Sequence, residues 1–109
     1  MIFIVVRFPV LESHLDQWPA LTAPFTEATR AEPGNLWFRW SRSLDDPNEY
    51  VLVEAFRDAE AGAAHVQSEH FRLGLQAMRP ALRDTPRIVH TEMAGEDWSR
   101  MGELEIVRS

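Results

Sequence analysis

Residues 32–71 read EPGNLWFRWSRSLDDPNEYVLVEAFRDAEAGAAHVQSEHF, and this stretch decides the fold. Two runs rich in β-branched and aromatic residues, 35–43 and 49–57, flank the turn-forming cluster LDDPN at 44–48. Such a pattern predicts an antiparallel β-hairpin with a loop of about four to five residues. Pro33 and Gly34, just before the hairpin, are suited to end a preceding helix.

The end of the same stretch predicts two helical pieces, at 58–66 and 69–83, with a break near Gln67. Asp58 is a suitable N-cap for the first piece and Ser68 for the second. Because a new helix begins at Ser68, the residues before and after it need not follow the angular spacing of a single helix.

The flanking sequence completes the predicted topology. Residues 2–8 (IFIVVRF) form a strand that Pro9 is expected to end, and residues 87–93 form another. Residues 12–31 have helical apolar spacing, with Ser13 as an expected N-cap.

Proline sets limits on that first helix. Pro19 and Pro24 argue against one straight helix, so a kink or a late start near Trp18 is expected. The predicted order is β-α-β-β-α-β, a ferredoxin-like α+β fold whose antiparallel sheet carries its helices on one face.

One domain is expected over residues 1–109, with a core at 1–95 and a C-terminal tail at 96–109 that holds the strand-like segment ELEIV. The two hairpin strands carry large apolar groups on both faces. Helices can cover only one face, and the other would expose more apolar surface than monomers usually tolerate. We therefore expect a homodimer that buries the second sheet face.

Composition excludes several function classes. The formal net charge is −6, and the 11 positive side chains are all arginine and are dispersed, so no nucleic-acid partner is expected. The lack of lysine and cysteine excludes Schiff-base chemistry, thiol nucleophiles and thiolate metal sites. No apolar run has the length of a membrane span, and no signal peptide is recognisable, so a cytoplasmic protein without a membrane partner is expected.

Two histidines and one glutamate are the main candidates for chemistry. His65 and His70 would lie about 140° apart on one helix, but the break at Ser68 allows both to face one site. The dipole of the helix that ends near His65 predicts that the pKa of His65 is raised. Glu54 lies on the strand face that should be buried, so its carboxyl must be paired or functional. Structural roles remain open for all three, including an ion pair of Glu54 with an arginine or with His65.

Aromatic residues near these candidates could line a cavity for a flat aromatic ligand, although core packing is the alternative for each ring. The residues expected to contact the ligand are Trp37, Phe38, Trp40, His70, Phe71 and Met78. Four histidines without close ligand spacing do not predict a metal site.

The segments EPG, SxDDP, VLVExFxD and AHxxSxHF together resemble the antibiotic biosynthesis monooxygenase (ABM) domain, in particular its quinol monooxygenase branch. The resemblance covers residues 1 to about 95. It implies a dimeric α+β barrel, a pocket between sheet and helices, and oxidation of phenolic or quinol compounds by dioxygen without flavin, haem or metal. His65 and Glu54 match the family's histidine and strand glutamate. Haem-degrading members use an asparagine in the first strand, and IFIVVRF has none, which argues against haem oxygenation.

The expected mechanism has His65 as the base and Glu54 as the group that orients it, acting on a small aromatic ligand with dioxygen as co-substrate and no cofactor. Two alternatives remain. One is a non-catalytic small-molecule binding module with the same fold, and the other is an isomerase or lyase that acts on a small carbonyl compound.

Overall fold

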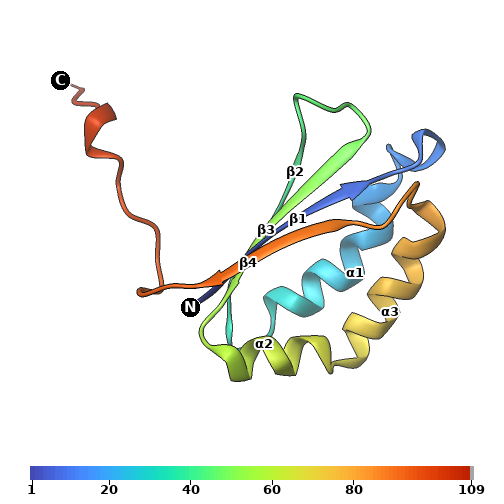
Figure 1. The fold of residues 1–109 in the computed structure, drawn as a ribbon, viewed down its shortest axis with the longest axis horizontal. Coiled ribbons are helices and arrows are strands. Elements are labelled where there is room, and N and C mark those ends of the chain that lie inside the picture. The colour runs from blue at the N-terminus through green and yellow to red at the C-terminus, as the bar shows by residue number, and fades with distance from the viewer. Residues whose placement is uncertain (109) are drawn as a thin grey trace.

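The structure, a computed structural model, describes residues 1–108. Its main elements are β1 (Ile2–Pro9), α1 (Trp18–Arg30), β2 (Asn35–Arg42), β3 (Glu49–Phe56), α2 (Ala59–Val66), α3 (Glu69–Met78) and β4 (Arg87–Glu92). Short 3₁₀ segments span Glu12–His14, Arg79–Ala81 and Gly102–Leu104. The strands form one antiparallel sheet in the order β2-β3-β1-β4, with all three α-helices on one side (Figure 1). The ferredoxin-like α+β fold is confirmed.

Side-chain caps divide the helical region after the hairpin as predicted. The Asp58 carboxylate accepts a hydrogen bond from the backbone N–H of Ala61 at 2.8 Å, and α2 begins. The Ser68 hydroxyl accepts from the N–H of Phe71 at 3.1 Å, and extended backbone at Ser68 separates α2 from α3. Each cap satisfies a donor that a helix start leaves unpaired, so the break is local in origin.

Three local predictions are corrected. Ser13 does not cap α1, because α1 begins at Trp18 with Pro19 in its first turn, and the Ser13 hydroxyl instead lies 2.9 Å from Nδ1 of His14. Strand β1 includes Pro9, which sits near the edge of the paired region where no further sheet N–H is needed. The tail segment ELEIV forms a 3₁₀ turn and irregular backbone rather than a strand.

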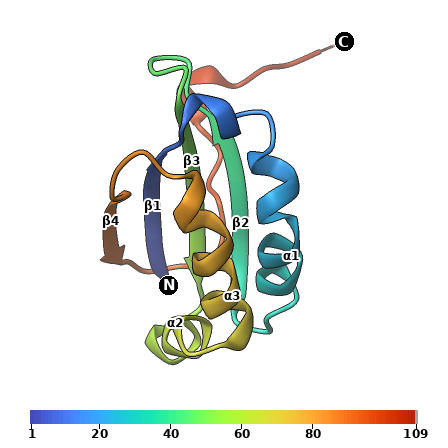
Figure 2. The ribbon, with the colours of Figure 1, turned by 90° about the vertical axis from the view of Figure 1, so that its right-hand side faces the viewer.

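The face of the sheet beneath the helices holds the core. In Figure 2, α3 lies in front of β3 and β2, α1 lies beside β2, and β4 stays at the opposite edge. Alternate strand residues point into this layer and are nearly fully buried, among them Phe8, Phe38, Leu52 and Phe56. We call this the covered face.

The opposite face, which we call the open face, is not covered by helices. Val5, Val51 and Val53 are half-buried there, and Val89 of β4 is 67% exposed. Trp98 of the tail packs on Trp37 with ring centroids 5.1 Å apart.

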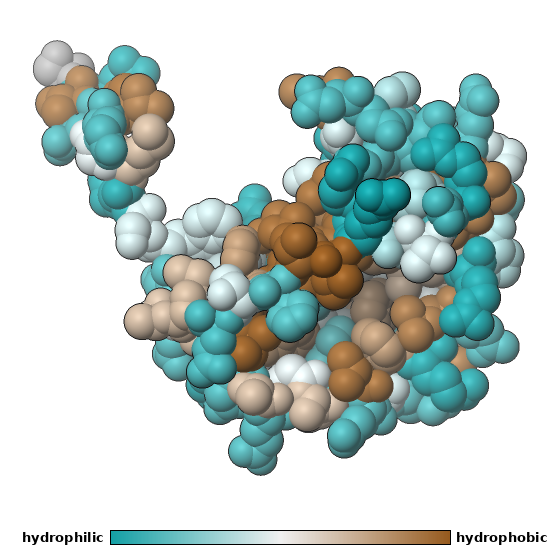
Figure 3. Space-filling model, viewed as in Figure 1, coloured by the Kyte–Doolittle hydropathy of each residue, from teal (hydrophilic) through white to brown (hydrophobic). Residues whose placement is uncertain are grey.

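Beyond this contact the tail projects away from the domain, and Figure 3 shows hydrophobic side chains on its projecting end. Among the described residues, no helix combines the length and apolar character needed to cross a membrane.

Candidate functional site

Four titratable side chains form one chain of contacts beneath the covered face. His65 Nδ1 lies 2.7 Å from Glu32 Oε2, and His70 Nε2 lies 2.5 Å from the same oxygen. On the other side of the ring, His65 Nε2 is 3.9 Å from Glu54 Oε1. The side chains of Glu54 and His65 are only 7% and 5% exposed, and exposure then rises to 15% at Glu32 and 28% at His70. The cluster therefore runs from the core to the surface.

Four separate segments supply these residues. Glu54 comes from β3, His65 from the end of α2, His70 from the first turn of α3, and Glu32 from the turn after α1. The Ser68 hydroxyl donates to the carbonyl of His65 at 2.6 Å, so the cap that separates the helices also holds the His65 backbone. Since the two histidines belong to different helices, both rings can reach one carboxylate.

A close backbone approach brings the Glu32 turn to α2. A Cβ atom added at Gly34 would lie 2.3 Å from Cβ of Ala61, far inside contact distance. Only glycine allows this approach. The EPG turn therefore has a structural role in the site, because it holds Glu32 against the helix that carries His65.

Phenylalanine rings enclose the His65 imidazole. The ring centroids of Phe56, Phe71, Phe25 and Phe38 lie 4.7, 5.1, 5.7 and 6.4 Å from that of His65. These contacts hold the imidazole in one orientation and exclude water from it.

Burial controls the electrostatics of the inner pair. It raises the pKa of Glu54 to about 7, and the negative charge of Glu32 adds to the increase. The pKa of His65 is lowered, chiefly by burial, although its contact with Glu32 acts in the opposite direction. The helix-dipole prediction for His65 was therefore wrong, because desolvation of a nearly buried ring outweighs a dipole at the helix end.

The six expected ligand-contacting residues do not share one cavity: Trp37, Phe38 and Trp40 border a hollow along β2, whereas Met78 lines a separate cavity. Trp37 lies on the open face, and Phe38 is 1% exposed within the core. Trp40 packs on Phe8 and donates its Nε1–H to the Thr26 hydroxyl at 2.8 Å. Residue alternation along β2 explains the separation, because adjacent strand residues face opposite sides.

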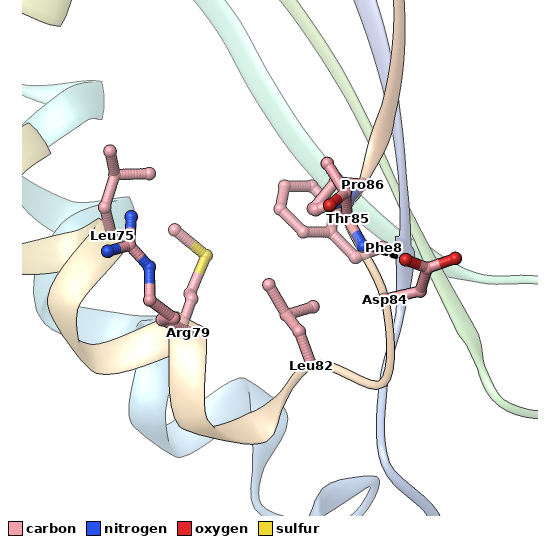
Figure 4. Close-up of a pocket in the computed structure, with 8 residues that line it drawn as sticks. Phe8, Leu75, Arg79, Leu82, Asp84, Thr85 and Pro86 are labelled. Carbon is pink, nitrogen blue, oxygen red and sulfur yellow. Dashed lines mark hydrogen bonds between the residues drawn. The ribbon is translucent and has the colours of Figure 1, made fainter.

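A cavity of about 410 Å³ lies between the end of α3 and the start of β4 (Figure 4). Its walls are mainly apolar and include Phe8, Leu75 and Met78, and the charged residues that line it are Arg79 and Asp84. Neither His65 nor Glu54 lines it. Along α3, however, Phe71, Leu75 and Met78 share one face; Phe71 contacts His65, Met78 lines the cavity, and the two residues lie about 10 Å apart along the helix.

Sequence reasoning missed Glu32 as a site residue and treated it only as part of a turn. It lies 33 residues from His65 in the sequence, so no local spacing connects them. The useful signal was a carboxylate two residues before a glycine at a helix end. Glu32, His65 and His70 are also the residues whose donor atoms come close enough together to hold a metal ion.

The remaining histidines lie outside this cluster. Ile4 of β1 pairs with Glu54 of β3 on one side and with His90 of β4 on the other. His90 therefore lies on the covered face, two strands from Glu54, and its side chain is exposed. His14 lies in the 3₁₀ segment after β1, next to Leu15, whose carbonyl accepts the Tyr50 hydroxyl at the far end of β3.

Comparisons with known proteins agree on the family. The family model described as "Antibiotic biosynthesis monooxygenase" matches residues 1–77. A search of curated proteins found no match.

Solved structures share the fold. A protein from Nitrosomonas europaea named "Putative antibiotic biosynthesis monooxygenase" is 25% identical, with a TM-score of 0.78 over 85% of this chain and 98% of that chain. The protein Rv0793 from Mycobacterium tuberculosis is 23% identical, with a TM-score of 0.78 over 87% of this chain and 96% of that one. A conserved protein from Methanosarcina mazei Go1 is 19% identical, with a TM-score of 0.80 over 85% of this chain and 92% of that one. The family match and the shared fold together show that this chain belongs to the antibiotic biosynthesis monooxygenase family.

Proposed function

We propose that the protein is a cofactor-independent monooxygenase that oxidises a small phenolic or quinol compound with dioxygen. Family membership supports monooxygenase chemistry at a general level. The observation that carries the specific proposal is the buried Glu54–His65 pair. Its carboxyl has a pKa raised to about 7, and phenylalanine rings surround the neighbouring imidazole.

Such a pair is suited to take a proton from a phenol at neutral pH. The lowered pKa of His65 keeps its imidazole neutral and able to accept a proton. The raised pKa of Glu54, about 7, lets its carboxyl carry a proton near neutral pH and donate it to the phenolic oxygen. The 3.9 Å gap between His65 Nε2 and Glu54 Oε1 is wide enough for a phenolic oxygen to contact both atoms at about 2.8 Å. In this proposal His65 takes the proton, Glu54 contacts the same substrate oxygen, and Glu32 orients the imidazole through Nδ1.

The remaining chemistry belongs to the substrate. A phenolate is a one-electron reductant, and it passes an electron to dioxygen, after which the radical pair combines at a ring carbon. Conversion of a phenol ring C–H to a quinone carbonyl supplies all four electrons that dioxygen accepts. One oxygen atom enters the ring and the other leaves as water, so no external reductant is needed. The residues contribute deprotonation, positioning and exclusion of water.

The ligand's place is inferred from the shape of α3. An elongated aromatic compound would occupy the cavity beside Met78 and extend along the face of α3 that carries Leu75 and Phe71 towards His65. This arrangement would use Phe71 and Met78 as contacts, while Phe38 supports the base from the core. It favours a substrate of two or more fused rings over a single ring.

Oxygen uptake by EDTA-treated protein with a panel of phenols, hydroquinones and naphthohydroquinones tests the proposal. We expect uptake with a quinone product, reduced by about 10²-fold or more in His65→Ala. Glu54→Gln provides a milder second variant, and His14→Ala is the matched control that should keep full activity. Circular dichroism checks that each variant is folded.

Three outcomes would overturn the proposal. They are the absence of oxygen uptake with compounds that bind, uptake that appears only after metal is added, and unchanged turnover in a folded His65→Ala protein. Binding without oxygen consumption would favour a non-catalytic binding module of the same fold.

We also infer that two copies associate through the open face. Support comes from the half-buried Val5, Val51 and Val53 on that face and from Val89, which is 67% exposed in one chain. Apolar side chains of the projecting tail, including Leu104 at 66% exposed, would gain burial in the same contact. Association would remove apolar surface that a single chain leaves in water.

A further inference from the structure

We propose that Glu32, His65 and His70 form a binding site for one divalent transition-metal ion of the Zn²⁺ type. The proposal goes beyond the monooxygenase chemistry above, which requires no metal and which a bound ion would block, because His65 would then carry its proton on Nε2 and could not act as the base. It rests on the geometry, burial and charge of the cluster.

The three side chains present a donor set that such ions prefer. Nδ1 of His65, Nε2 of His70 and a carboxylate oxygen of Glu32 all lie within 4.8 Å of one another. Two imidazole nitrogens and one carboxylate oxygen suit zinc and other first-row ions, whereas Mg²⁺ and Ca²⁺ favour oxygen ligands. Three protein ligands also leave a fourth position for water, as in catalytic zinc sites.

The ligands are held in place by the fold rather than by one helix. His65 is fixed among four phenylalanine rings, and Glu32 is held by the close packing of Gly34 against Ala61. The His70 side chain is 28% exposed, which provides a route for an ion to enter from solvent. A site with two fixed ligands and one movable ligand loses little conformational freedom on binding.

The charge around the cluster favours a cation. Glu32 and Glu54 lie on opposite sides of the His65 ring, and within residues 1–108 their ion-pair contacts are made only with histidines. Among residues 1–108, no arginine forms an ion pair with either carboxylate. A divalent ion at Nδ1 of His65 would supply the missing positive charge. Glu54 on the Nε2 side would then complete the carboxylate–histidine–metal arrangement that commonly orients a ligating histidine.

Binding requires only a local adjustment. The contacts from Glu32 to His65 and to His70, at 2.7 and 2.5 Å, are hydrogen bonds in the metal-free cluster. Donor atoms around a tetrahedral ion with bonds of about 2.0–2.1 Å lie about 3.3 Å apart. The Glu32 oxygen must therefore move away from each ring nitrogen by less than about 1 Å, and the two ring nitrogens, which lie within 4.8 Å of each other, must adopt the same spacing; the partly exposed His70 ring is the ligand with room to rotate. The ion would replace the protons that Glu32 shares with the two rings.

Titration calorimetry of untagged, EDTA-treated and desalted protein with ZnCl₂ tests the site, with CoCl₂ absorption as a second readout. We expect one ion per chain and the visible bands of nitrogen- and oxygen-coordinated Co²⁺. Glu32→Gln and His70→Ala should each weaken binding by at least about tenfold, the range seen when a ligand or its support is lost. His14→Ala and His90→Ala are matched controls and should bind as the unmodified chain does.

Three results would overturn the proposal: zinc heats no larger than those with MgCl₂, binding that is unchanged in folded Glu32→Gln and His70→Ala, or an equal loss in His14→Ala or His90→Ala. No substrate enters this experiment. Its failure would therefore leave the proposed oxidation untouched, and a failed oxygen-uptake assay would leave the metal site untouched.

Discussion

The covered and open faces of the sheet are made of similar residues but have different surroundings. On β3, Leu52 points into the helix layer and is 2% exposed, while its neighbour Val53 points to the open face and is half-buried. Both faces are apolar, yet the chain supplies helices for only one. The difference shows that burial on the covered face is complete within one chain, whereas the open face still has apolar area to bury.

Chemistry follows the same division. Glu54 shares the covered face with Leu52 and Phe56, and burial there both raises its pKa and brings it near His65. On the open face the charged pair Arg7–Glu49 stays near the edge, where Arg7 keeps solvent access. Glu54 is a carboxyl buried among apolar residues of the covered face, and this unusual position indicates a functional site.

The largest effect is expected from an aspartate placed on each face in turn. Leu52→Asp would bury an unpaired carboxylate in the core and should cost about 4 kcal/mol or more, enough to unfold the domain. Val53→Asp should leave the chain folded but abolish association through the open face. Circular dichroism and sedimentation measure the two outcomes. If the unmodified protein is a monomer at about 10 μM, the open face is not an interface between two copies, since specific dimers are stable at that concentration.

A second effect concerns the pH dependence of stability. The ordinary pKa of Glu54 is 4.5 and its folded value is about 7, so between these pH values the folded state holds a proton that the unfolded chain has lost. Stability from Glu54 is therefore fully present below pH 4.5 and falls as pH rises towards 7. Glutamine does not titrate. Glu54→Gln should gain up to about 3 kcal/mol relative to the unmodified chain between about pH 4 and pH 8.

Urea unfolding of both proteins in EDTA at the two pH values measures this change. Glu49→Gln is a useful control because Glu49 is also buried on β3 but is paired with Arg7 at 2.9 Å. If the unfolding free energies of Glu54→Gln and the unmodified chain differ by the same amount at both pH values, Glu54 has its ordinary pKa in the folded protein.

A third effect separates helix packing from helix propensity. A Cβ at Gly74 of α3 would lie 2.7 Å from Cδ1 of Phe25, where α1 and α3 pack over the covered face. Gly74→Ala should therefore cost about 1–3 kcal/mol despite better helix propensity. Gly62 of α2 has no such neighbour within 4 Å, so Gly62→Ala should stabilise by about 0.5–1 kcal/mol. Thermal unfolding should move the two midpoints in opposite directions, and shifts of the same sign would contradict the close packing at Gly74.

The smallest effect is expected where the tail meets the open face. Trp98 is 61% exposed and contacts Trp37, so Trp98→Ala should lower stability by about 0.5–1.5 kcal/mol. Met101→Ala is the control, because Met101 is 63% exposed and should change little. Urea unfolding followed by far-UV circular dichroism measures both. An effect of Trp98→Ala above about 3 kcal/mol would show that the tail is part of the core, since only buried residues give such losses.

Local rules were sufficient for most of the fold. The hairpin followed from LDDPN between two β-rich runs, and the break before α3 followed from the capping side chain of Ser68. The late start of α1 at Trp18 followed from Pro19, which fits only the first turn of a helix. These features depend on neighbours in the chain, so the sequence carries them directly. The tail was misjudged because its β-rich composition had no partner strand.

The site was only partly predictable. Alternation along β3 put Glu54 on the buried face, and the restart at Ser68 allowed His65 and His70 to meet, so their nearness could be expected from sequence. Glu32 could not be found this way, because its contact with His65 depends on how closely the Gly34 turn packs against α2.

The sequence by itself therefore determined the order of the elements, the two apolar faces of the sheet and the residue types available for chemistry. Each of these is set by periodicity and by capping within a few residues. Tertiary structure decided that one carboxylate joins two histidines and that burial controls the pKa of Glu54 and of His65. These outcomes depend on desolvation and on contacts between distant segments, which exist only once the helices have packed on the sheet.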